Sequence, residues 1–278
     1  MIARAARGGL QEAGAVVEAC LRNYCGFGTA FYKRISMEGM EPFLEGKNAV
    51  VTGGTRGIGF AIAEALLAAG AQVAICGRGH TTVENAVTQL ANGSKSKVVG
   101  KAADVRSSTE VVNFFQFVDR ELGGLDILVN NAGIGVFRST AELSVDDWTK
   151  TLETNLSGAF YCSKEALPRM RNRNGGYVIH ISSLAGKNAF AGGAAYNASK
   201  FGLNGLSEAM MLDHRYEGVR VSCVMPGSVD TEFGRGSKGG ADWKIASEDV
   251  AEIVLMLLKT PVRTLISRIE VRPSQPPK

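Results

Sequence analysis

A tyrosine and a lysine four residues apart, Tyr196 and Lys200, form the pair in this sequence that most directly suggests catalysis. This spacing places both side chains on one face of a helix. A phenol normally titrates at about pH 10, and a cation held beside it favours the phenolate and lowers that pKa. The pair predicts a tyrosine that exchanges a proton with a substrate oxygen at neutral pH. A solvated helix face with no catalytic role is the alternative.

Three further features favour the catalytic interpretation. Ser183 lies thirteen residues before Tyr196, shortly after an apolar run at 177–181 that is typical of a strand. Asn155 lies farther upstream, and a glycine-rich stretch occupies 52–59. A chance coincidence of all these features in this order is improbable.

Together these features resemble the short-chain dehydrogenase/reductase family. Its signature is a TGxxxGIG turn, an NNAG segment, and a tetrad of Asn, Ser and Tyr-xxx-Lys. This sequence carries them at 52–59, at 130–133, and at Asn155, Ser183, Tyr196 and Lys200. The resemblance covers about residues 43–273. It implies an NADP(H)-dependent oxidoreductase that interconverts a ketone or aldehyde and the corresponding alcohol by hydride transfer.

The resemblance also implies a role for each residue of the tetrad. Tyr196 would be the general acid for carbonyl reduction and the base for alcohol oxidation. Lys200 would lower the pKa of Tyr196 and hold the nicotinamide ribose. Ser183 would donate a hydrogen bond to the substrate oxygen, and Asn155 would hold a water in a proton relay that reaches Lys200. Ser182 is a rival to Ser183, but its spacing to Tyr196 is less typical.

Strand and helix patterns alternate regularly along the chain. Strand patterns occupy 49–51, 73–76, 98–103, 125–129, 177–181, 219–224 and 266–271. Helix patterns lie between them, with capping-box spacing at Thr81 and Glu84, at Ser107 and Glu110, and at Ser144 and Asp147. Strands that alternate with helices predict a parallel sheet with helices on both faces. We expect a Rossmann-type, three-layer, doubly wound α/β fold with a mainly seven-stranded parallel sheet, forming one catalytic domain over 43–278.

The glycine turn, which lies between a strand and a helix, predicts a nucleotide site. Glycine lets the backbone turn tightly and lets a pyrophosphate approach the free N–H groups of the helix start. Enzymes that prefer NAD usually carry an acid at the end of the second strand. Here that position holds Arg78, and Arg56 lies inside the turn. These cations suit a 2′-phosphate and predict NADP(H), although two solvent-exposed arginines are the alternative.

The resemblance places other residues around the cofactor. Asp104 would contact the adenine amino group, and Val105 would flank the ring. Val229 would bond the nicotinamide amide through its backbone. The expected cofactor set is Gly53, Thr55, Arg56, Gly57, Ile58, Gly59, Arg78, Asp104, Val105, Asn131, Ala132, Gly133, Tyr196, Lys200, Pro226, Gly227, Val229 and Thr231.

A glycine-rich segment at about 232–246 stands where the family has its substrate lid. Its composition indicates mobility rather than a deep, fixed hydrophobic pocket. Phe233 and Trp243 would cover a substrate or anchor the lid, and with Ser183 and Tyr196 they form the expected substrate set. The chain end at 266–273 resembles the branch that acts on short hydroxy acids and small carbonyls.

Two alternative functions share these motifs. A 3-oxoacyl-acyl-carrier-protein reductase would need a basic patch for its acidic carrier protein. Candidates for such a patch are Arg138, Arg169, Arg171 and Arg173. A catalytically silent NADP-binding regulator is disfavoured, since all four positions of the tetrad are intact. His180 is interpreted as a packed histidine, and Cys162 and Cys223 as small buried residues.

Composition limits the remaining possibilities. The 278 residues are 45% hydrophobic and 21% charged, with a net charge of +4, which is too mild to indicate nucleic-acid binding. No apolar run reaches the length of a membrane span. Five scattered cysteines show no metal-ligand spacing, so we expect no metal and a reducing, cytoplasmic location. Residues 1–42 fall outside the family pattern; a targeting peptide, a helical arm and an early translation start are the alternatives, and targeting is not favoured.

Two long helices, expected at 146–171 and 195–216, predict self-association. The second carries more apolar residues than one stripe against its own sheet requires: Phe201, Leu203, Leu206, Ala209, Met210 and Leu212. A two-fold axis would pair these helices with their copies. We therefore expect a dimer or tetramer, with the seventh strand available for a second contact, whereas a single wide core face is the alternative.

Overall fold

In the described part of the chain, seven strands form one parallel sheet. The computed structural model describes residues 42–233 and 242–277, so the N-terminal extension before residue 42 lies outside them. The strands are β1 (Asn48–Thr52), β2 (Gln72–Gly77), β3 (Val98–Ala102), β4 (Ile127–Asn130), β5 (Gly176–Ile181), β6 (Val219–Pro226) and β7 (Arg268–Val271). Their order is β3-β2-β1-β4-β5-β6-β7, and every pair is parallel. The predicted fold class is confirmed. Parallel strands are joined by crossover helices, and these helices cover both faces of the sheet.

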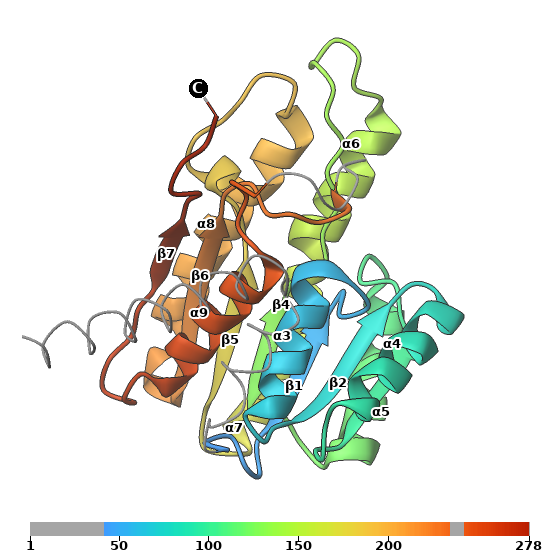
Figure 1. Cartoon of the computed structure of the whole chain (residues 1–278), viewed down its shortest axis with the longest axis vertical. Coiled ribbons are helices and arrows are strands. Elements are labelled where there is room, and N and C mark those ends of the chain that lie inside the picture. Colours follow the sequence, from blue (N-terminus) through green and yellow to red (C-terminus); the bar gives the residue numbers. More distant parts are fainter. Residues whose placement is uncertain (1–41, 234–241, 278) are drawn as a thin grey trace, which may run out of the picture. The chain divides into compact units, whose positions relative to one another are not determined.

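Helices cover the two faces of this sheet. On one face α3 (Gly57–Ala68) lies side by side with α9 (Ser247–Lys259), as Figure 1 shows, and α4 (His80–Asn92) packs beside β3. The other face carries α5 (Ser108–Leu122), α7 (Gly158–Arg171) and α8 (Ala194–His214). A core there joins Phe114 and Phe115 of α5 to Met170 of α7 and to strand residues such as Leu128. No helix among the described residues is long and apolar enough to cross a membrane.

The capping predictions fare differently at the three helix starts. Ser107 accepts a hydrogen bond from the Glu110 N–H, and Ser144 accepts one from the Asp147 N–H, so both N-caps are confirmed. The Glu110 carboxylate, however, accepts from the Asp104 N–H instead of closing a box with Ser107. The predicted cap at Thr81 is wrong. The extended Gly79 already ends the preceding loop, and Thr81 lies within the first turn of α4.

The long helix expected at 146–171 is interrupted by a π-helical turn. Helix α6 (Val145–Leu152) runs into η1 (Glu153–Ser157), and α7 follows directly. Asn155 lies in this turn, where its side-chain amide exchanges two hydrogen bonds with the backbone of Ile134. A π turn re-aims one side chain without ending the helix, so this local change points Asn155 at the segment after β4.

Candidate active site

A cleft of about 960 Å³ lies at the carboxyl ends of the strands. Strands β1 and β4 are neighbours in the sheet, yet the chain leaves them toward opposite sheet edges. Ligands of open α/β sheets bind at such a topological switch point. Every residue of the expected cofactor and substrate sets lines the cleft. Asn155 alone of the tetrad does not, because it is almost fully buried behind the wall.

Three positions of the glycine turn, Gly53, Gly57 and Gly59, require glycine. A Cβ on Gly59 would lie 2.3 Å from the Gly53 carbonyl oxygen and 2.4 Å from Asn131 Nδ2. Gly53 and Gly57 have φ values of 64° and 55°, which favour glycine. The N-cap residue of α3, Arg56, caps no backbone N–H with its side chain, so the first turn of α3 presents free N–H groups to an anion.

Asn131 braces this turn from the neighbouring strand. Its Nδ2 donates to the carbonyl oxygens of Thr52 (3.0 Å) and Gly53 (3.2 Å). In return, the Thr52 hydroxyl accepts from the N–H groups of Asn131 and Ala132. The Asn131 amide is therefore committed to holding the glycine turn, a role that the sequence interpretation missed.

Charged side chains gather at the β2 and β3 end of the cleft. Arg78 follows β2 and is exposed, and Arg56 Nη1 lies 2.9 Å from Glu232 Oε2. Asp104 is clasped by Arg106, whose Nε and Nη2 both donate to its carboxylate. This guanidinium holds the pKa of Asp104 below its ordinary value. Sequence reasoning missed Arg106, although it stands only two residues from Asp104.

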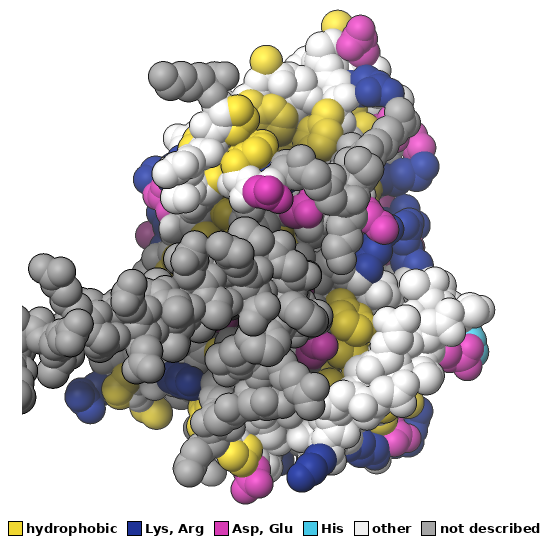
Figure 2. Space-filling view, in the orientation of Figure 1, with side chains coloured by type: hydrophobic (Ala, Val, Ile, Leu, Met, Phe, Trp, Pro, Cys, Tyr) yellow, Lys and Arg dark blue, Asp and Glu magenta, His cyan; other side chains and the backbone are white. Residues whose placement is uncertain are grey.

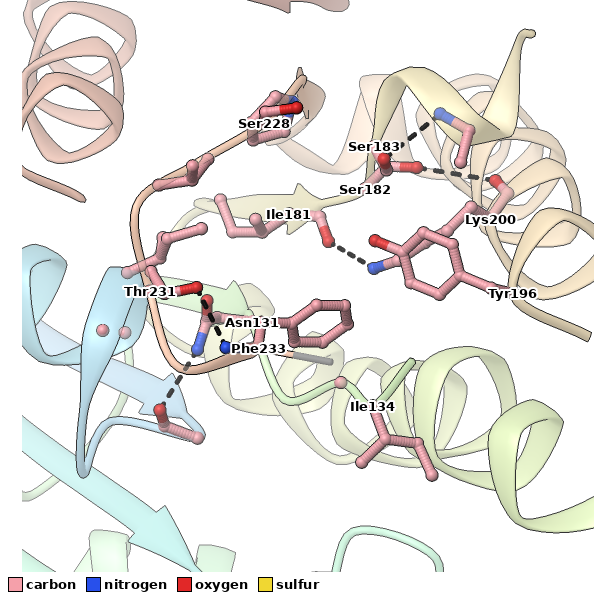
Figure 3. Close-up of a pocket in the computed structure, with 18 of the residues that line it drawn as sticks. Asn131, Ile134, Ile181, Ser182, Ser183, Tyr196, Lys200, Ser228, Thr231 and Phe233 are labelled. Carbon is pink, nitrogen blue, oxygen red and sulfur yellow. Dashed lines mark hydrogen bonds between the residues drawn. The ribbon is translucent and has the colours of Figure 1, made fainter. Parts of the chain in front are cut away.

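Tyr196 and Lys200 come together near the start of α8, as the spacing predicted (Figure 3). Lys200 Nζ donates to the carbonyl oxygen of Ile181 at 2.9 Å and lies 5.7 Å from the centre of the Tyr196 ring. Burial of Lys200 lowers its pKa to about 8. Burial raises the pKa of Tyr196, and a hydrogen bond with Ser183 offsets only part of that rise.

The prediction that Lys200 lowers the pKa of Tyr196 is not supported, because burial raises that pKa and Ser183, not Lys200, is the group that lowers it. The ammonium is directed at a backbone carbonyl, and desolvation of the phenol outweighs its neighbours. A protonated phenol is the form that an acid for carbonyl reduction requires.

The two serines after β5 are distinguished by their partners. Ser182 Oγ donates to Asn204 Oδ1 at 2.6 Å and is almost fully buried. Ser183 accepts from the Ala185 N–H and hydrogen-bonds with Tyr196. This arrangement favours Ser183 over Ser182 as the partner of Tyr196 (Figure 3).

Asn155 connects to the tyrosine through the backbone. Its Nδ2 donates to Ser199 Oγ at 3.0 Å, and Ser199 Oγ donates to the Tyr196 carbonyl oxygen. These bonds fix the first turn of α8 against the π turn. A water-filled relay from Asn155 to Lys200 stays a prediction.

Two aromatic residues at this site were missed by sequence reasoning. The ring centroids of Phe137 and Phe190 lie 5.7 Å and 6.5 Å from that of Tyr196, and the Phe233 centroid lies at 5.6 Å. Phe137 and Phe190 stand in loops without a motif. The one available signal was that each loop follows the carboxyl end of a strand. Trp243 also lines the cleft, as expected.

Other residues singled out in the sequence lie away from the cleft. His180 is fully buried beside Asn130, and burial lowers its pKa to about 3, which confirms a packed histidine. Cys162 and Cys223 are buried, as predicted. None of the four arginines considered for a carrier-protein patch lines the cleft: Arg138 donates to the Phe137 carbonyl, and Arg169, Arg171 and Arg173 pair with Asp119, Glu217 and Asp126.

Comparison with known proteins identifies relatives over most of this chain. The short chain dehydrogenase family model matches residues 47–240. An uncharacterized oxidoreductase of Staphylococcus aureus is 34% identical over 230 residues, covering 83% of this chain and 98% of its own length. An alcohol dehydrogenase of the archaeon Thermococcus sibiricus, solved with 5-hydroxy-NADP, superposes with a TM-score of 0.79 at 29% identity, covering 84% of this chain and 99% of that one. A metagenomic short-chain oxidoreductase solved with NADP has a TM-score of 0.73 at 34% identity, with the same coverage.

Proposed function

We propose that this chain, which belongs to the short-chain dehydrogenase family, is an NADP(H)-dependent oxidoreductase that interconverts a ketone or aldehyde and the corresponding alcohol. The observation that carries the proposal is the convergence of Tyr196, Ser183 and Lys200 on one cleft whose far end has two arginines and no acid after β2. The two solved relatives that bind NADP or its hydroxy analogue support the same cofactor.

The residues present fit such a cofactor. The glycine turn lines the cleft beside the free N–H groups at the start of α3, where a pyrophosphate would bind. Arg78 and Arg56 would hold the 2′-phosphate through charge-assisted hydrogen bonds. Backbone groups at Val229 and the side chain of Thr231 would hold the nicotinamide end. When bound, the cofactor supplies or accepts the hydride.

The chain itself manages the proton and the substrate oxygen. Tyr196, kept neutral by burial, donates its proton to the carbonyl oxygen during reduction. Ser183, which hydrogen-bonds with Tyr196, positions the same oxygen. The buried ammonium of Lys200 stabilises negative charge that develops beside the phenol.

The observations favour this function over its two alternatives. A 3-oxoacyl-acyl-carrier-protein reductase would need cations for its carrier, yet the candidate arginines lie outside the cleft and three of them pair with carboxylates. A catalytically silent regulator would not require Tyr196, Ser183 and Lys200 to line the same cleft.

NADPH oxidation by the purified chain, followed by absorbance against ketones, aldehydes, keto acids and acetoacetyl thioesters, tests the proposal. We expect turnover of simple ketones or aldehydes and a preference for NADPH over NADH of at least about tenfold, equivalent to about 1.4 kcal/mol. NADPH binding without turnover of any carbonyl would instead favour the regulator. Turnover of the thioester alone would favour the carrier-protein reductase.

We further propose that the protein self-associates through α7 and α8. Phe160 on α7 and Phe201 and Leu212 on α8 are about half exposed, whereas Leu203 and Met210 face the core. Apolar residues left on the surface of two adjoining helices mark an interface between copies. Light scattering at micromolar concentration is expected to return at least twice the mass of one chain.

A further inference from the structure

Three phenylalanine rings surround Tyr196 at the substrate end of the cleft. Phe137 lies after β4, Phe190 precedes α8, and Phe233 follows β6. Their centroids lie 5.6–6.5 Å from that of Tyr196, and Phe137 also contacts Phe190 at 5.8 Å. All three line the cleft and remain 37–45% exposed, so they present apolar surface that their own packing does not cover.

The surrounding backbone holds two of these rings in place. A β-bridge between Arg138 and Gly193 ties the loop after β4 to the residue before α8. Asn197 Nδ2 donates to the Phe190 carbonyl oxygen at 2.9 Å, which fixes the second loop to the first turn of α8. The aromatic wall is therefore positioned before any substrate arrives.

A glycine allows the third ring to complete the wall. A Cβ on Gly135 would lie 2.7 Å from Phe233 and 2.8 Å from Phe137, so only glycine lets both rings approach this closely. Figure 3 shows the Phe233 ring close to Tyr196. Centroid spacings of this size match the edge-to-face and offset contacts that aromatic rings prefer.

The wall offers no compensation for a charged substrate group. Within the described residues, the cation–ring contacts involve Phe43, Phe115, Phe117, Tyr177 and Tyr196, and none involves the three rings of the wall. Arg138 is engaged with the Phe137 carbonyl, and Lys200 with that of Ile181. A carboxylate packed against these rings would lose hydration without gaining a partner from the rings themselves, although Lys244 and Arg272 also line the cleft.

We infer that Phe137, Phe190 and Phe233 form a subsite for an aryl group attached to the reacting carbonyl, so that the substrates are aryl ketones or aryl aldehydes and not short keto acids. This inference rests on the proposed function. The expectation that the glycine-rich segment at about 232–246 is a poor candidate for a deep, fixed hydrophobic pocket stays untested, because residues 234–241 lie outside the described part of the chain. The rings from the loops after β4 and before α8 supply most of the wall, and the lid contributes Phe233.

The test compares acetophenone, 2-butanone and pyruvate at saturating NADPH, using kcat/KM. Acetophenone is expected to exceed 2-butanone by at least about tenfold, which corresponds to about 1.4 kcal/mol. In the double variant Phe137→Ala/Phe190→Ala, the ratio of acetophenone to 2-butanone should fall at least about fivefold. This change of ratio cancels the intrinsic reactivities of the two ketones.

Controls separate the wall from general damage. Phe137→Leu/Phe190→Leu keeps apolar bulk and should retain an intermediate ratio, and Met256→Ala changes an equally exposed residue on α9 and should leave the ratio unchanged. NADPH binding, followed by fluorescence, reports whether each variant is folded. An unchanged ratio in both double variants, or a preference for pyruvate, would overturn the aryl subsite while leaving the proposed function standing. If no carbonyl is reduced although NADPH binds, the proposed function itself fails.

Discussion

The two ends of the cleft are built differently. At the glycine turn the wall is backbone, locked by hydrogen bonds from Asn131 and so crowded that a Cβ on Gly59 would overlap the Gly53 carbonyl. At the other end the wall is a set of half-exposed rings, Phe137, Phe190 and Phe233, carried by three loops. Tyr196 and Lys200 stand beside these rings on a rigid helix.

The two ends of the cleft should therefore differ in the substitutions that they tolerate. A backbone site recognises groups that every ligand of the family shares, and almost any added atom damages it. A side-chain site on loops changes its preference when one ring is replaced, while the fold stays intact.

Tyr196→Phe tests the point at which the two ends meet. Loss of the phenolic proton donor should reduce kcat by about 10²–10⁴, the usual contribution of acid–base catalysis. NADPH affinity should change little, because the phenyl ring keeps its packing. Steady-state kinetics and fluorescence titration measure the two quantities, and more than about a tenth of the original turnover would contradict the assignment.

Burial of Lys200 should make the stability of the fold depend on pH. Its pKa in the folded chain is about 8, against 10.5 for the free side chain, so between these values the unfolded chain binds more protons. The free energy of unfolding should therefore rise with pH through this window, by up to about 3 kcal/mol. Below about pH 8, burial of the charge destabilises the fold in full.

Lys200→Met removes that dependence. Urea unfolding between pH 7 and pH 10.5 should show the variant gaining stability relative to wild type at the low end, with the difference shrinking toward the high end. The unpaired Ile181 carbonyl adds a cost that is independent of pH, so the slope is the readout. Lys95→Met, at an exposed lysine, serves as the control. Parallel curves for wild type and Lys200→Met would refute the prediction.

Gly59→Ala tests the backbone end directly. The added Cβ meets the Gly53 oxygen and Asn131 Nδ2, so either the turn or its brace must move. We expect a loss of about 1–3 kcal/mol in stability, as for other overpacked sites, and weaker NADPH binding. Gly93→Ala, where a Cβ would meet nothing within 4 Å, should have neither effect. Equal behaviour of the two variants would show that the turn is not rigid.

Arg78→Ser should change cofactor choice without changing the chemistry. Removing the cation at the end of β2 should lower the ratio of kcat/KM for NADPH to that for NADH by about tenfold, or about 1.4 kcal/mol. The exposed Arg263, changed to Ser, is the matched control. A ratio that does not move would assign the 2′-phosphate to Arg56 alone.

Glu232→Gln is expected to have the smallest effect. The carboxylate pairs with Arg56 at 2.9 Å, but both side chains are more than half exposed. Exposed pairs contribute about 0.2–1 kcal/mol, so freeing Arg56 should strengthen NADPH binding by no more than about fivefold. The gain should vanish in 1 M salt, where exposed charges are screened. Weaker binding of NADPH would show that Glu232 positions Arg56 for the phosphate.

The sheet and the local motifs could be predicted from the amino-acid sequence alone. The seven strand patterns predicted all seven strands with ends correct to within two residues, and the glycine turn and the Tyr196–Lys200 spacing predicted residues that do line one cleft. These features are readable because each depends on neighbours a few positions away. Alternation, glycine conformation and helical spacing are all local properties.

Features that depend on contacts between distant segments could be seen only in the folded chain. Phe137 and Phe190 lie more than fifty residues apart and meet only because parallel strands end at the same edge of the sheet. The pKa of Tyr196 rises instead of falling because burial, which no spacing reveals, outweighs the hydrogen bond with Ser183, while Lys200 bonds the Ile181 carbonyl. The π turn at Asn155 is likewise accompanied by hydrogen bonds to the backbone of Ile134, which lies outside that helix. Desolvation and long-range contacts depend on residues that are distant in the sequence, so no local pattern predicts them.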